Sequence, residues 1–313
     1  MPTPTAFFEG KFVPLAEAKV NVMTHAFNYG TAVFEGIRGN WNAEQDELYL
    51  FKVRDHVRRI RQSAKIMRMT LKYTDDELVE IITDLVAQNG YREDIYIRPI
   101  VYKASEVVGV RMHNLDDDFL AFVTPFGAYL DPNAGARCMT SSWRRVDDTE
   151  IPARAKVTGL YVNNAMAKTE AQLNGFDEAI MLNQDGHVSE GSGENIVMVR
   201  KGVLVTPGPS DNILEGITLE TALMVAEREF GLKVERRSID RSELYIADEI
   251  FMTGTAAHVT PITEVDRVPV GDGLPGVVSK QIQDTYFAAI TGRMPQYRDW
   301  LTPIYARSKV ATS

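Results

Sequence analysis

The stretch Gly191-Ser192-Gly193-Glu194-Asn195-Ile196 begins like the glycine-rich loop that binds dinucleotides. It lacks the third glycine of that motif, and it leads into a run typical of a strand rather than into a helix that could receive a pyrophosphate. Short apolar runs joined by tight turns continue on both sides of it. These runs are Glu178–Leu182, His187–Glu190, Asn195–Val199 and Val203–Thr206. The pattern predicts an antiparallel or mixed sheet.

Helical and extended segments alternate over the rest of the sequence. Helices are predicted at Arg54–Met69, from the capping box Thr74–Glu77 to Asn89-Gly90, from Lys156 to about Gly175, at Thr218–Phe230 and from about Gly276 to Gly292. Further strands are predicted at Leu48–Lys52, Ile95–Tyr102, Phe119–Phe126 and Glu249–Thr255. Pro99 indicates an edge position or a bulge in its strand, because proline cannot donate a backbone hydrogen bond. The overall expectation is an α+β fold.

The segment Tyr129–Ala136 contains proline, asparagine and glycine with few apolar residues, and it is the expected interdomain linker. We therefore expect a small N-terminal domain over residues 1–128 and a larger C-terminal domain over residues 137–313. A chain of 313 residues has the length of about two domains.

The composition excludes several classes of function. The chain has 34 basic and 43 acidic residues, a net charge of −9, which argues against a general nucleic-acid binder. No apolar run of about 18 residues occurs, so no membrane span is expected. The start Met1–Thr5 has no features of a secretion signal. Because Cys138 is the single cysteine, an intrachain disulfide is excluded, and a cytoplasmic protein is expected.

Three common catalytic motifs are missing from the sequence. The five histidines never occur four residues apart and no H-E-x-x-H is present, so no catalytic metal is expected. No Walker A sequence occurs. The serine elbow G-x-S-x-G is also missing, which weakens the case for an α/β-hydrolase.

Two turns are candidates for phosphate binding. Leu214–Thr218 runs directly into a predicted helix, where Gly216 lets a ligand approach and the first helical N–H groups are free. A plain threonine N-cap explains this turn as well. The second candidate, Thr253–Ala257, ends a strand with small and hydroxyl side chains.

Lys156 is a candidate for Schiff-base chemistry. It lies among small residues in Ala153–Gly159, with Arg154 close by. Partial burial and a cationic neighbour both lower the pKa of an amine, as a Schiff-base lysine requires. The alternative is a solvated surface lysine.

Taken in order along the chain, these features resemble the class IV pyridoxal-phosphate aminotransferases, and within them the branched-chain amino-acid aminotransferases. The resemblance extends from about Phe27 to Gly292. Its most specific stretches are Tyr29–Arg38, Tyr96–Pro99, Ala155-Lys156, Ser189–Asn195, Gly216–Thr218 and Phe251–Ala257. It implies a two-domain enzyme of fold type IV, like the D-amino-acid aminotransferases. The larger C-terminal domain, with a mixed or antiparallel sheet, would bind pyridoxal 5'-phosphate.

The resemblance also assigns cofactor residues. Lys156 matches the lysine that holds the cofactor as a Schiff base and then moves the substrate proton as a general acid and base. Glu190 matches the carboxylate that keeps the pyridine nitrogen protonated. Tyr161 matches the partner of the ring oxygen. Arg59 matches the phosphate arginine, with Arg58 and Arg61 as adjacent alternatives. The remaining matches are two supporting residues and the phosphate cup: Glu194, Asn195, Gly216, Ile217, Thr218, Gly254 and Thr255.

Substrate residues follow from the same resemblance. Ala256 and Ala257 match the turn whose amides hold the α-carboxylate, assisted by the Tyr96 hydroxyl, and Arg98 matches the residue that meets the γ-carboxylate of glutamate. An apolar pocket suits leucine, isoleucine and valine, because burying such a side chain is worth about 1.5–3 kcal/mol. The other expected pocket residues are Tyr29, Phe34, Gly36, Arg38, Val110, Phe126 and Tyr129.

The family supplies Tyr29 and Val110 from the neighbouring subunit, so the resemblance implies a homodimer or a higher oligomer with its active site at the subunit interface. The sequence departs from the family at Phe126, where tryptophan is common, at His258, where an acidic residue is common, and over Ser105–Met112. These departures affect the expected side-chain preference rather than the chemistry.

The expected reaction is the ping-pong transfer of an amino group from a branched-chain L-amino acid to 2-oxoglutarate. D-amino-acid aminotransferases, (R)-amine transaminases and aminodeoxychorismate lyases share the fold and the lysine. The stretch Tyr29–Arg38 with Tyr96 and Arg98 favours the branched-chain type. A non-enzymatic binding protein of this fold would be expected to have lost the catalytic groups. A Schiff-base aldolase would show the β/α repeat of a barrel, which is missing.

Overall fold

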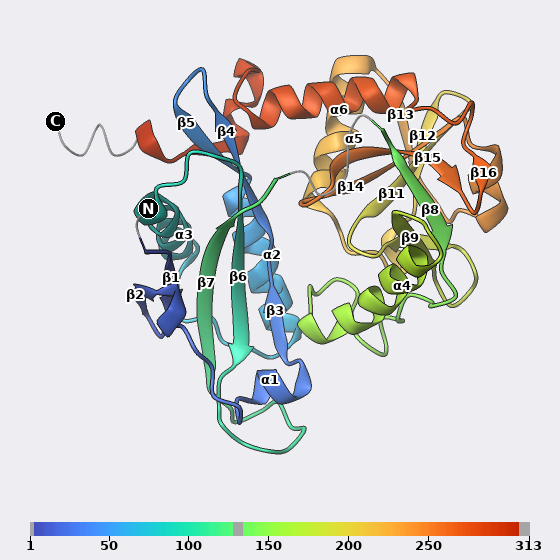
Figure 1. Ribbon diagram of the computed structural model, residues 1–313. Coiled ribbons are helices and arrows are strands. Elements are labelled where there is room, and N and C mark those ends of the chain that lie inside the picture. Colours follow the sequence, from blue (N-terminus) through green and yellow to red (C-terminus); the bar gives the residue numbers. More distant parts are fainter. Residues whose placement is uncertain (1–2, 128–133, 307–313) are drawn as a thin grey trace. The chain divides into compact units, whose positions relative to one another are not determined.

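The computed structural model describes residues 3–127 and 134–306, which form two compact units (Figure 1). Unit 1 contains the described residues of Met1–Gly127, Ala155–Gly159 and Ala288–Ser313. Unit 2 contains those of Ala128–Arg154 and Leu160–Phe287. Two later segments thus return to unit 1, and one of them carries Lys156. Residues 129–133 of the expected linker lie outside the described part, and Ala136 already begins a strand.

Unit 1 is built on an antiparallel sheet with the strand order β17-β5-β4-β6-β7-β1-β2, in which β3 also pairs with β6. The predicted strands near Leu48, Ile95 and Phe119 are confirmed as β5, β6 and β7. The strands of this sheet are β1 (Thr5–Phe8), β2 (Lys11–Pro14), β3 (Ala32–Phe34), β4 (Ile37–Asn42), β5 (Glu47–Phe51), β6 (Ile95–Lys103), β7 (Asp117–Pro125) and β17 (Leu301–Pro303).

Pro99 does not lie on an edge strand, so that alternative is wrong. Strand β6 pairs with β7 along its whole length and with β4 and β3 on its other side. Glu35 and Gly36 interrupt the strand between β3 and β4, and the Glu35 amide donates to the Pro99 carbonyl at 2.9 Å. Proline is therefore accommodated opposite an interruption between two strands.

Two helices, α2 (Val53–Ile66) and α3 (Asp75–Asn89), cover the sheet of unit 1. Apolar residues at helical spacing, such as Val57 and Ile60 on α2 and Leu78 and Ile82 on α3, are buried between them and the sheet. The capping box predicted at Thr74 is confirmed. The shorter helices of this unit are α1 (His25–Tyr29), η1 (Leu15–Glu17) and η5 (Pro295–Trp300).

Unit 2 contains a mixed sheet in the order β10-β9-β8-β15-β14-β11-β12-β13, as the sequence predicted. An additional pairing of β10 with β11 closes six of its strands into a ring, whose interior holds apolar side chains such as Cys138, Ile196 and Met252. The strands are β8 (Ala136–Thr140), β9 (Glu178–Leu182), β10 (Val188–Gly191), β11 (Asn195–Arg200), β12 (Val203–Thr206), β13 (Lys233–Arg236), β14 (Glu249–Gly254), β15 (His258–Val265) and β16 (Val268–Pro269).

Helix α4 (Tyr161–Leu173) packs on β9 and β8, and α5 (Ile217–Phe230) packs on β14. The Glu249 carboxylate accepts the first free amides of α6 (Val277–Ile290), at 2.9 Å from Val278 and 2.8 Å from Ser279. No helix among the described residues is long and apolar enough to cross a bilayer. The 3-10 turns are η2 (Thr158–Leu160), η3 (Pro209–Asp211) and η4 (Arg241–Ile246).

Candidate active site

The backbone of Lys156 is fixed inside unit 1 by two elements. Its carbonyl accepts the Phe34 amide of β3 at 3.0 Å, and its own amide donates to the Ser63 hydroxyl of α2 at 3.1 Å. The Lys156 ammonium lies 4.9 Å from the centre of the Phe34 ring. The main chain of the lysine is therefore anchored on both a strand and a helix, and its side chain is half-buried.

The neighbouring segment depends on two glycines. Gly30 has φ +66, and a Cβ added there would lie 2.9 Å from the Gly159 backbone. The Thr158 hydroxyl donates to the Gly30 carbonyl at 2.8 Å. Only a residue without a side chain permits this contact, which holds the chain just beyond Lys156 against the start of the Tyr29–Arg38 stretch.

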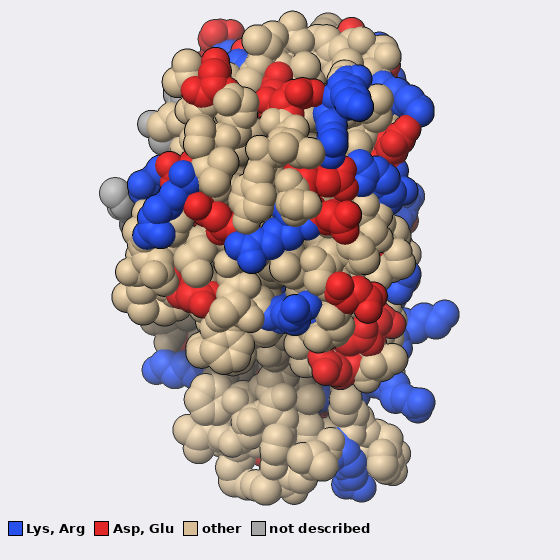
Figure 2. Space-filling view, turned by 90° about the vertical axis from the view of Figure 1, so that its right-hand side faces the viewer, with Lys and Arg blue, Asp and Glu red and all other residues tan. Residues whose placement is uncertain are grey.

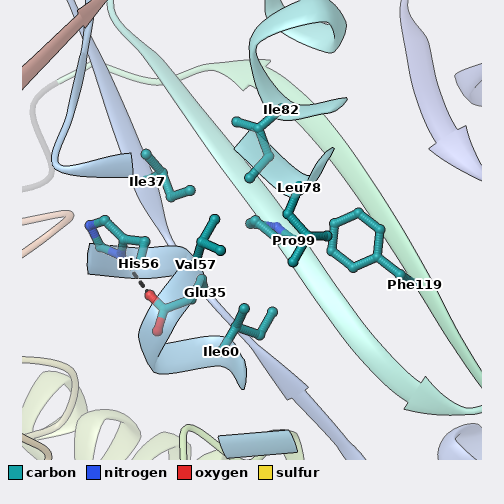
Figure 3. Close-up of a pocket in the computed structure, with 9 residues that line it drawn as sticks. All are labelled: Glu35, Ile37, His56, Val57, Ile60, Leu78, Ile82, Pro99 and Phe119. Atoms are coloured by element: carbon teal, nitrogen blue, oxygen red, sulfur yellow. Dashed lines mark hydrogen bonds and ion pairs between the residues drawn. The ribbon is translucent and has the colours of Figure 1, made fainter. Parts of the chain in front are cut away.

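Arg59, the expected phosphate arginine, is held by a carboxylate. Its Nε lies 2.7 Å from Glu35 Oε1 and its Nη2 lies 2.8 Å from Glu35 Oε2, a bidentate ion pair. His56 Nδ1 lies 2.7 Å from the same Oε2 (Figure 3). A carboxylate can only accept, so Nδ1 carries the hydrogen. His56, Arg59 and Ser63 fall on one face of α2, at spacings of three and four residues.

The Glu35 carboxylate is fully buried, and apolar side chains surround it and His56 (Figure 3). Burial by itself would raise the pKa of Glu35, but the Arg59 guanidinium and the His56 ring hold this pKa well below its usual range. Burial lowers the pKa of His56 despite the nearby carboxylate, so the ring is neutral at pH 7. Glu35 is thus an anion that fixes the orientation of Arg59.

The expected pocket residues Phe34, Tyr96 and Arg98 form a cluster in unit 1. Tyr96 and Arg98 are two residues apart on β6 and share one face of the sheet. The Arg98 guanidinium donates to the Tyr96 hydroxyl at 2.9 Å and lies 4.4 Å from the centre of the Phe34 ring. A Cβ added to Gly36 would come within 2.1 Å of the Tyr96 hydroxyl, so a larger residue at that position would displace the Tyr96 side chain. The Phe126 ring lies 5.4 Å from the Tyr96 ring.

Arg38 contacts the main chain that follows β7. Its guanidinium donates to the carbonyls of Phe126 at 2.8 Å and Gly127 at 3.3 Å, and its side chain is buried. Tyr129, another expected pocket residue, lies outside the described residues.

Tyr29 and Val110 lie on α1 and on the loop after β6. The Tyr29 hydroxyl accepts the Gly109 amide at 3.0 Å, and His25 Nε2 lies 2.8 Å from the Gly109 carbonyl. The loop is therefore pinned to α1, while Val110 itself stays 82% exposed. Other large apolar side chains are exposed on the same two segments and just before α1, namely Val22, Met23, Phe27, Val107 and Val108. The lower end of Figure 2, at the height of α1 in Figure 1, carries few charged side chains.

Glu190 of unit 2 is buried and fully hydrogen-bonded. Arg145 Nη2 lies 2.7 Å from Glu190 Oε1, while Oε2 accepts the Leu214 amide at 2.9 Å and the Asn195 side chain at 3.1 Å. The register of β10 and β11 places Glu190 opposite Asn195. The carboxylate therefore accepts from three donors on separate segments, and one of them, Arg145, is its countercharge.

Asn195 connects this carboxylate to the start of α5. Its side chain also donates to the Leu214 carbonyl at 2.8 Å, and its Oδ1 would be 2.0 Å from a Cβ on Gly216. Gly216 is the N-cap of α5 and makes no side-chain cap. The amides of Ile217 and Thr218 have no acceptor among the described residues, as is usual for the first turn of a helix, and such free amides are able to bind an anion.

The Thr253–Ala257 turn lies beside Asn195, because β14 pairs with β11 at Thr253 and Asn195. The Thr253 hydroxyl is buried with no hydrogen-bond partner in the described structure. Pairing of Gly254 with His258 closes the turn. The His258 ring packs 5.1 Å from Phe287, so the departure from an acidic residue places an aromatic ring there.

Two further predicted residues lie in unit 2. Tyr161 begins α4, one turn before the buried Asn164. Glu194 is buried, and burial together with the neighbouring Glu178 raises its pKa to about 8. A group of this kind is a neutral acid at pH 7, and its Oε2 accepts the Gly193 amide at 3.0 Å. No cluster of metal-ligating side chains occurs within residues 3–127 and 134–306.

Five residues that support these groups are not expected from the sequence: Glu35, His56, Ser63, Arg145 and Asn164. Glu35 stood inside a quoted motif, but nothing in the sequence shows which cation it would meet. A countercharge for Glu190 could have been sought, since a buried carboxylate requires one. The adjacent pair Arg144-Arg145 was then a candidate, but the sequence does not show which of the two is buried.

Residues 32–265 match the family model for amino-transferase class IV. The chain belongs to this family. A probable branched-chain-amino-acid aminotransferase of Aquifex aeolicus is 48% identical over 300 residues, 96% of each chain. The branched-chain aminotransferase of Thermoproteus uzoniensis, crystallised with norvaline, is 44% identical, with a TM-score of 0.92 over 96% of this chain and 99% of that one.

A second solved structure is that of the branched-chain amino acid aminotransferase of Thermobaculum terrenum in its PLP-form, the holo-form. It is 38% identical, with a TM-score of 0.92 over 97% of this chain and 99% of the other. The class IV aminotransferase family and fold expected from the sequence motifs are thereby confirmed.

Proposed function

We propose that this class IV aminotransferase uses pyridoxal 5'-phosphate to transfer the amino group of L-leucine, L-isoleucine or L-valine to 2-oxoglutarate. The observation that carries the proposal is the position of Asn195. Its side chain contacts both the Glu190 carboxylate and the helix start at Gly216. A carboxylate and an anion-binding helix start held in a fixed relation fit a ligand with a basic ring nitrogen and a phosphate.

The residues present also fit the rest of the cofactor. Ile217 and Thr218 offer free amides, and the buried Thr253 hydroxyl lacks an acceptor, so a phosphate dianion would meet several donors. Thr255 and Gly254 belong to the same turn. In unit 1, Glu35 holds Nε and Nη2 of Arg59 and so fixes the orientation in which the guanidinium would meet a phosphate. When bound, pyridoxal phosphate supplies an aldehyde that condenses with amines and a ring that accepts electrons from the substrate α-carbon.

Each proposed catalytic role follows from a group on this chain. The Lys156 Nζ would hold the cofactor covalently and would serve as the base for the proton on the substrate α-carbon. Glu190 would accept the hydrogen bond of the ring nitrogen, and Tyr161 would donate to the ring oxygen. Glu194 supports the turn at Gly254, because a Cβ added to Gly254 would lie only 3.2 Å from the Glu194 side chain.

The proposed substrate pocket has an apolar wall and one cation. Phe34, Tyr96 and Phe126 would surround a branched aliphatic side chain. Arg98 would meet the γ-carboxylate of glutamate, and its Nε is buried with no partner in the described residues. The amides of Ala256 and Ala257 would hold the α-carboxylate. Gly36 makes room for the Tyr96 hydroxyl, and Arg38 holds the main chain at Phe126, so both act on the pocket through these neighbours.

We also propose a homodimer in which Tyr29 of the partner subunit and Val110 of the partner subunit complete this pocket. The support is the apolar, exposed surface of α1 and the loop at Val108, since large exposed apolar patches mark interaction sites. Val108→Asp should yield monomers in sedimentation and lower turnover. A variant that remains dimeric and fully active would contradict this interface. The expected cytoplasmic location stays a prediction.

The decisive experiment combines a substrate panel with chemical trapping. Borohydride reduction of the purified protein with pyridoxal phosphate should label the Lys156 peptide, and initial rates should be higher on L-leucine than on D-alanine or (R)-1-phenylethylamine. Parallel double-reciprocal lines for amino donor and acceptor would support the two half-reactions. Faster turnover of D-alanine or the amine would assign one of the related activities instead.

Lys156→Ala should reduce turnover by at least ~10²–10⁴-fold, because the base for the α-proton is lost. The matched control is Lys65→Ala, which removes an exposed lysine of α2 and should leave the rate unchanged. Full turnover of Lys156→Ala would reject the mechanism.

A further inference from the structure

Arg145 is one of the largest fully buried side chains in the described residues. Its Nε lies 3.2 Å from the Asn212 carbonyl, its Nη1 lies 2.8 Å from Asn164 Oδ1, and its Nη2 lies 2.7 Å from Glu190 Oε1. Two of these partners are neutral, and Glu190 is the single carboxylate among them. Burying a guanidinium is costly unless a charge and several hydrogen bonds offset it, so this arrangement is specific rather than incidental.

The guanidinium is also rigidly held. Its backbone amide donates to the Leu182 carbonyl of β9 at 2.8 Å. Asn164, which accepts from it, donates in turn to the Ser192 carbonyl at 2.6 Å. Because Asn164 lies one turn after Tyr161 on α4, the same helix face connects the Arg145 side chain to another proposed cofactor residue.

We propose that Arg145 is a positioning residue that lowers the proton affinity of Glu190, so that a proton shared between this carboxylate and a cofactor ring nitrogen stays on the nitrogen. The inference rests on the proposed function. It adds a residue, and a reason for its charge, to the site.

The physical argument is a competition of two bases for one proton. A buried carboxylate without a countercharge gains proton affinity, since burial disfavours the charged form. Glu190 would then take the proton and leave the ring nitrogen neutral, a poorer acceptor of electrons. A cation in contact with the carboxylate prevents this. Coulomb energy falls with distance, so Arg145 affects the carboxylate that it contacts more than the base beyond it.

The test compares Arg145→Met with wild type after both are loaded with pyridoxal phosphate labelled with nitrogen-15 in the ring. In wild type the nitrogen resonance should report a protonated ring. In Arg145→Met it should move to the unprotonated position, and kcat should fall about 10–100-fold, as for other partners that orient a functional group, with KM little changed. Arg145→Lys keeps the charge and should restore the wild-type resonance.

The matched control is Arg144→Met. Arg144 is the adjacent residue, is exposed, and donates to the main-chain carbonyls of Asn183 and Gln184. This variant should keep both the resonance and kcat. If a folded, loaded Arg145→Met protein also keeps both, the inference is overturned. A wild-type protein whose Lys156 takes up no borohydride label would instead overturn the proposed function.

If Arg145→Met fails to fold, the double variant Arg145→Met/Glu190→Gln decides the question. Glutamine at position 190 carries no charge, so the buried pair is removed together and folding is expected. The double variant should then have the same kcat as Glu190→Gln alone, because Arg145 acts through the carboxylate. A further tenfold loss in the double variant would overturn the inference.

Discussion

The two units place opposite charges at their proposed cofactor contacts and support them in the same way. In unit 1 the arginine Arg59 is backed by the carboxylate Glu35, and in unit 2 the carboxylate Glu190 is backed by the arginine Arg145. The two ion pairs differ in the elements that supply the residues around the carboxylate. Glu35, at the interruption between two strands, meets Arg59 and His56 on one helix, whereas Glu190 draws its partners Arg145, Asn195 and Leu214 from three separate segments. Each unit therefore orients its charged group before any ligand binds.

The strongest test of this symmetry is Glu35→Gln. It leaves Arg59 without its buried anion, and the free energy of unfolding at pH 7 should fall by about 3–5 kcal/mol. Because the pKa of Glu35 is held below its ordinary value near 4.5, the wild-type advantage exists above that pH and is lost as the pH falls below it. Urea unfolding of both proteins over pH measures the difference.

The control for Glu35→Gln is Glu80→Gln, an exposed carboxylate on α3, which should change stability by less than about 0.5 kcal/mol. If the two variants were equally stable at pH 7, the buried pair of unit 1 would have no energetic role and the comparison between the units would fail.

Glu194 sharpens the comparison because it is a buried acid of unit 2 without a cation in contact. Its pKa is raised from 4.5 to about 8 by burial and Glu178, so wild-type stability should fall as the pH rises through this window and then level off. Glu194→Gln should remove up to ~1.4 kcal/mol of that loss per pH unit. Unfolding free energies at both ends of the window measure it, with the exposed Glu227→Gln as control. Parallel pH profiles for the two variants would refute the raised pKa.

Arg59→Lys tests the geometry of the unit 1 pair rather than its charge. A lysine cannot make the bidentate contact to Glu35, so the affinity for pyridoxal phosphate should fall about tenfold while the net charge stays constant. Titration of the cofactor followed by its absorbance gives the dissociation constant. Arg58→Lys, on the exposed side of the same helix, should bind like wild type. A larger loss at position 58 would reassign the phosphate arginine.

The smallest expected effect belongs to Ser63→Ala. The hydroxyl that accepts the Lys156 amide is lost, at a cost of about 1 kcal/mol in unfolding free energy. Thermal unfolding compares this variant with Gln62→Ala, its exposed neighbour. Should the two melt together, β3 alone would be sufficient to anchor the lysine segment.

Much of the fold could be predicted from periodicity, because burial imposes a spacing of two on strands and about 3.6 on helices. The apolar, β-branched and aromatic run Ile95–Tyr102 and the capping box at Thr74 are local signals, and the strand and the cap that they predict are both confirmed. The edge position predicted for Pro99 is wrong, because a proline fits this central strand only where the opposite strand is interrupted at Glu35. No local sequence pattern shows which residues two strands bring opposite each other.

The candidate site could be predicted in part, since its motifs are continuous in sequence and resemble those of a family. The residues behind it could not. Arg145 and Glu190 are brought together by the closed ring of strands and by the turn at Leu214, and a sequence does not show which of two adjacent arginines points inward. Predicting the contact between Glu35 and Arg59 would have required the register in which β3 and β4 pair with β6.

The return of Ala155–Gly159 and Ala288–Ser313 to unit 1 has a practical consequence for dissecting the protein. A gene cut after residue 127 would divide unit 1, because the first polypeptide would lack two of its segments and the second would contain unit 2 together with those two segments. The first would lack the strand β17 at the edge of its sheet, and the second would separate Lys156 from Phe34 and Ser63, which hold its main chain. The two polypeptides would therefore have to be mixed before study, so that Ala155–Gly159 and Ala288–Ser313 can pack on the rest of unit 1.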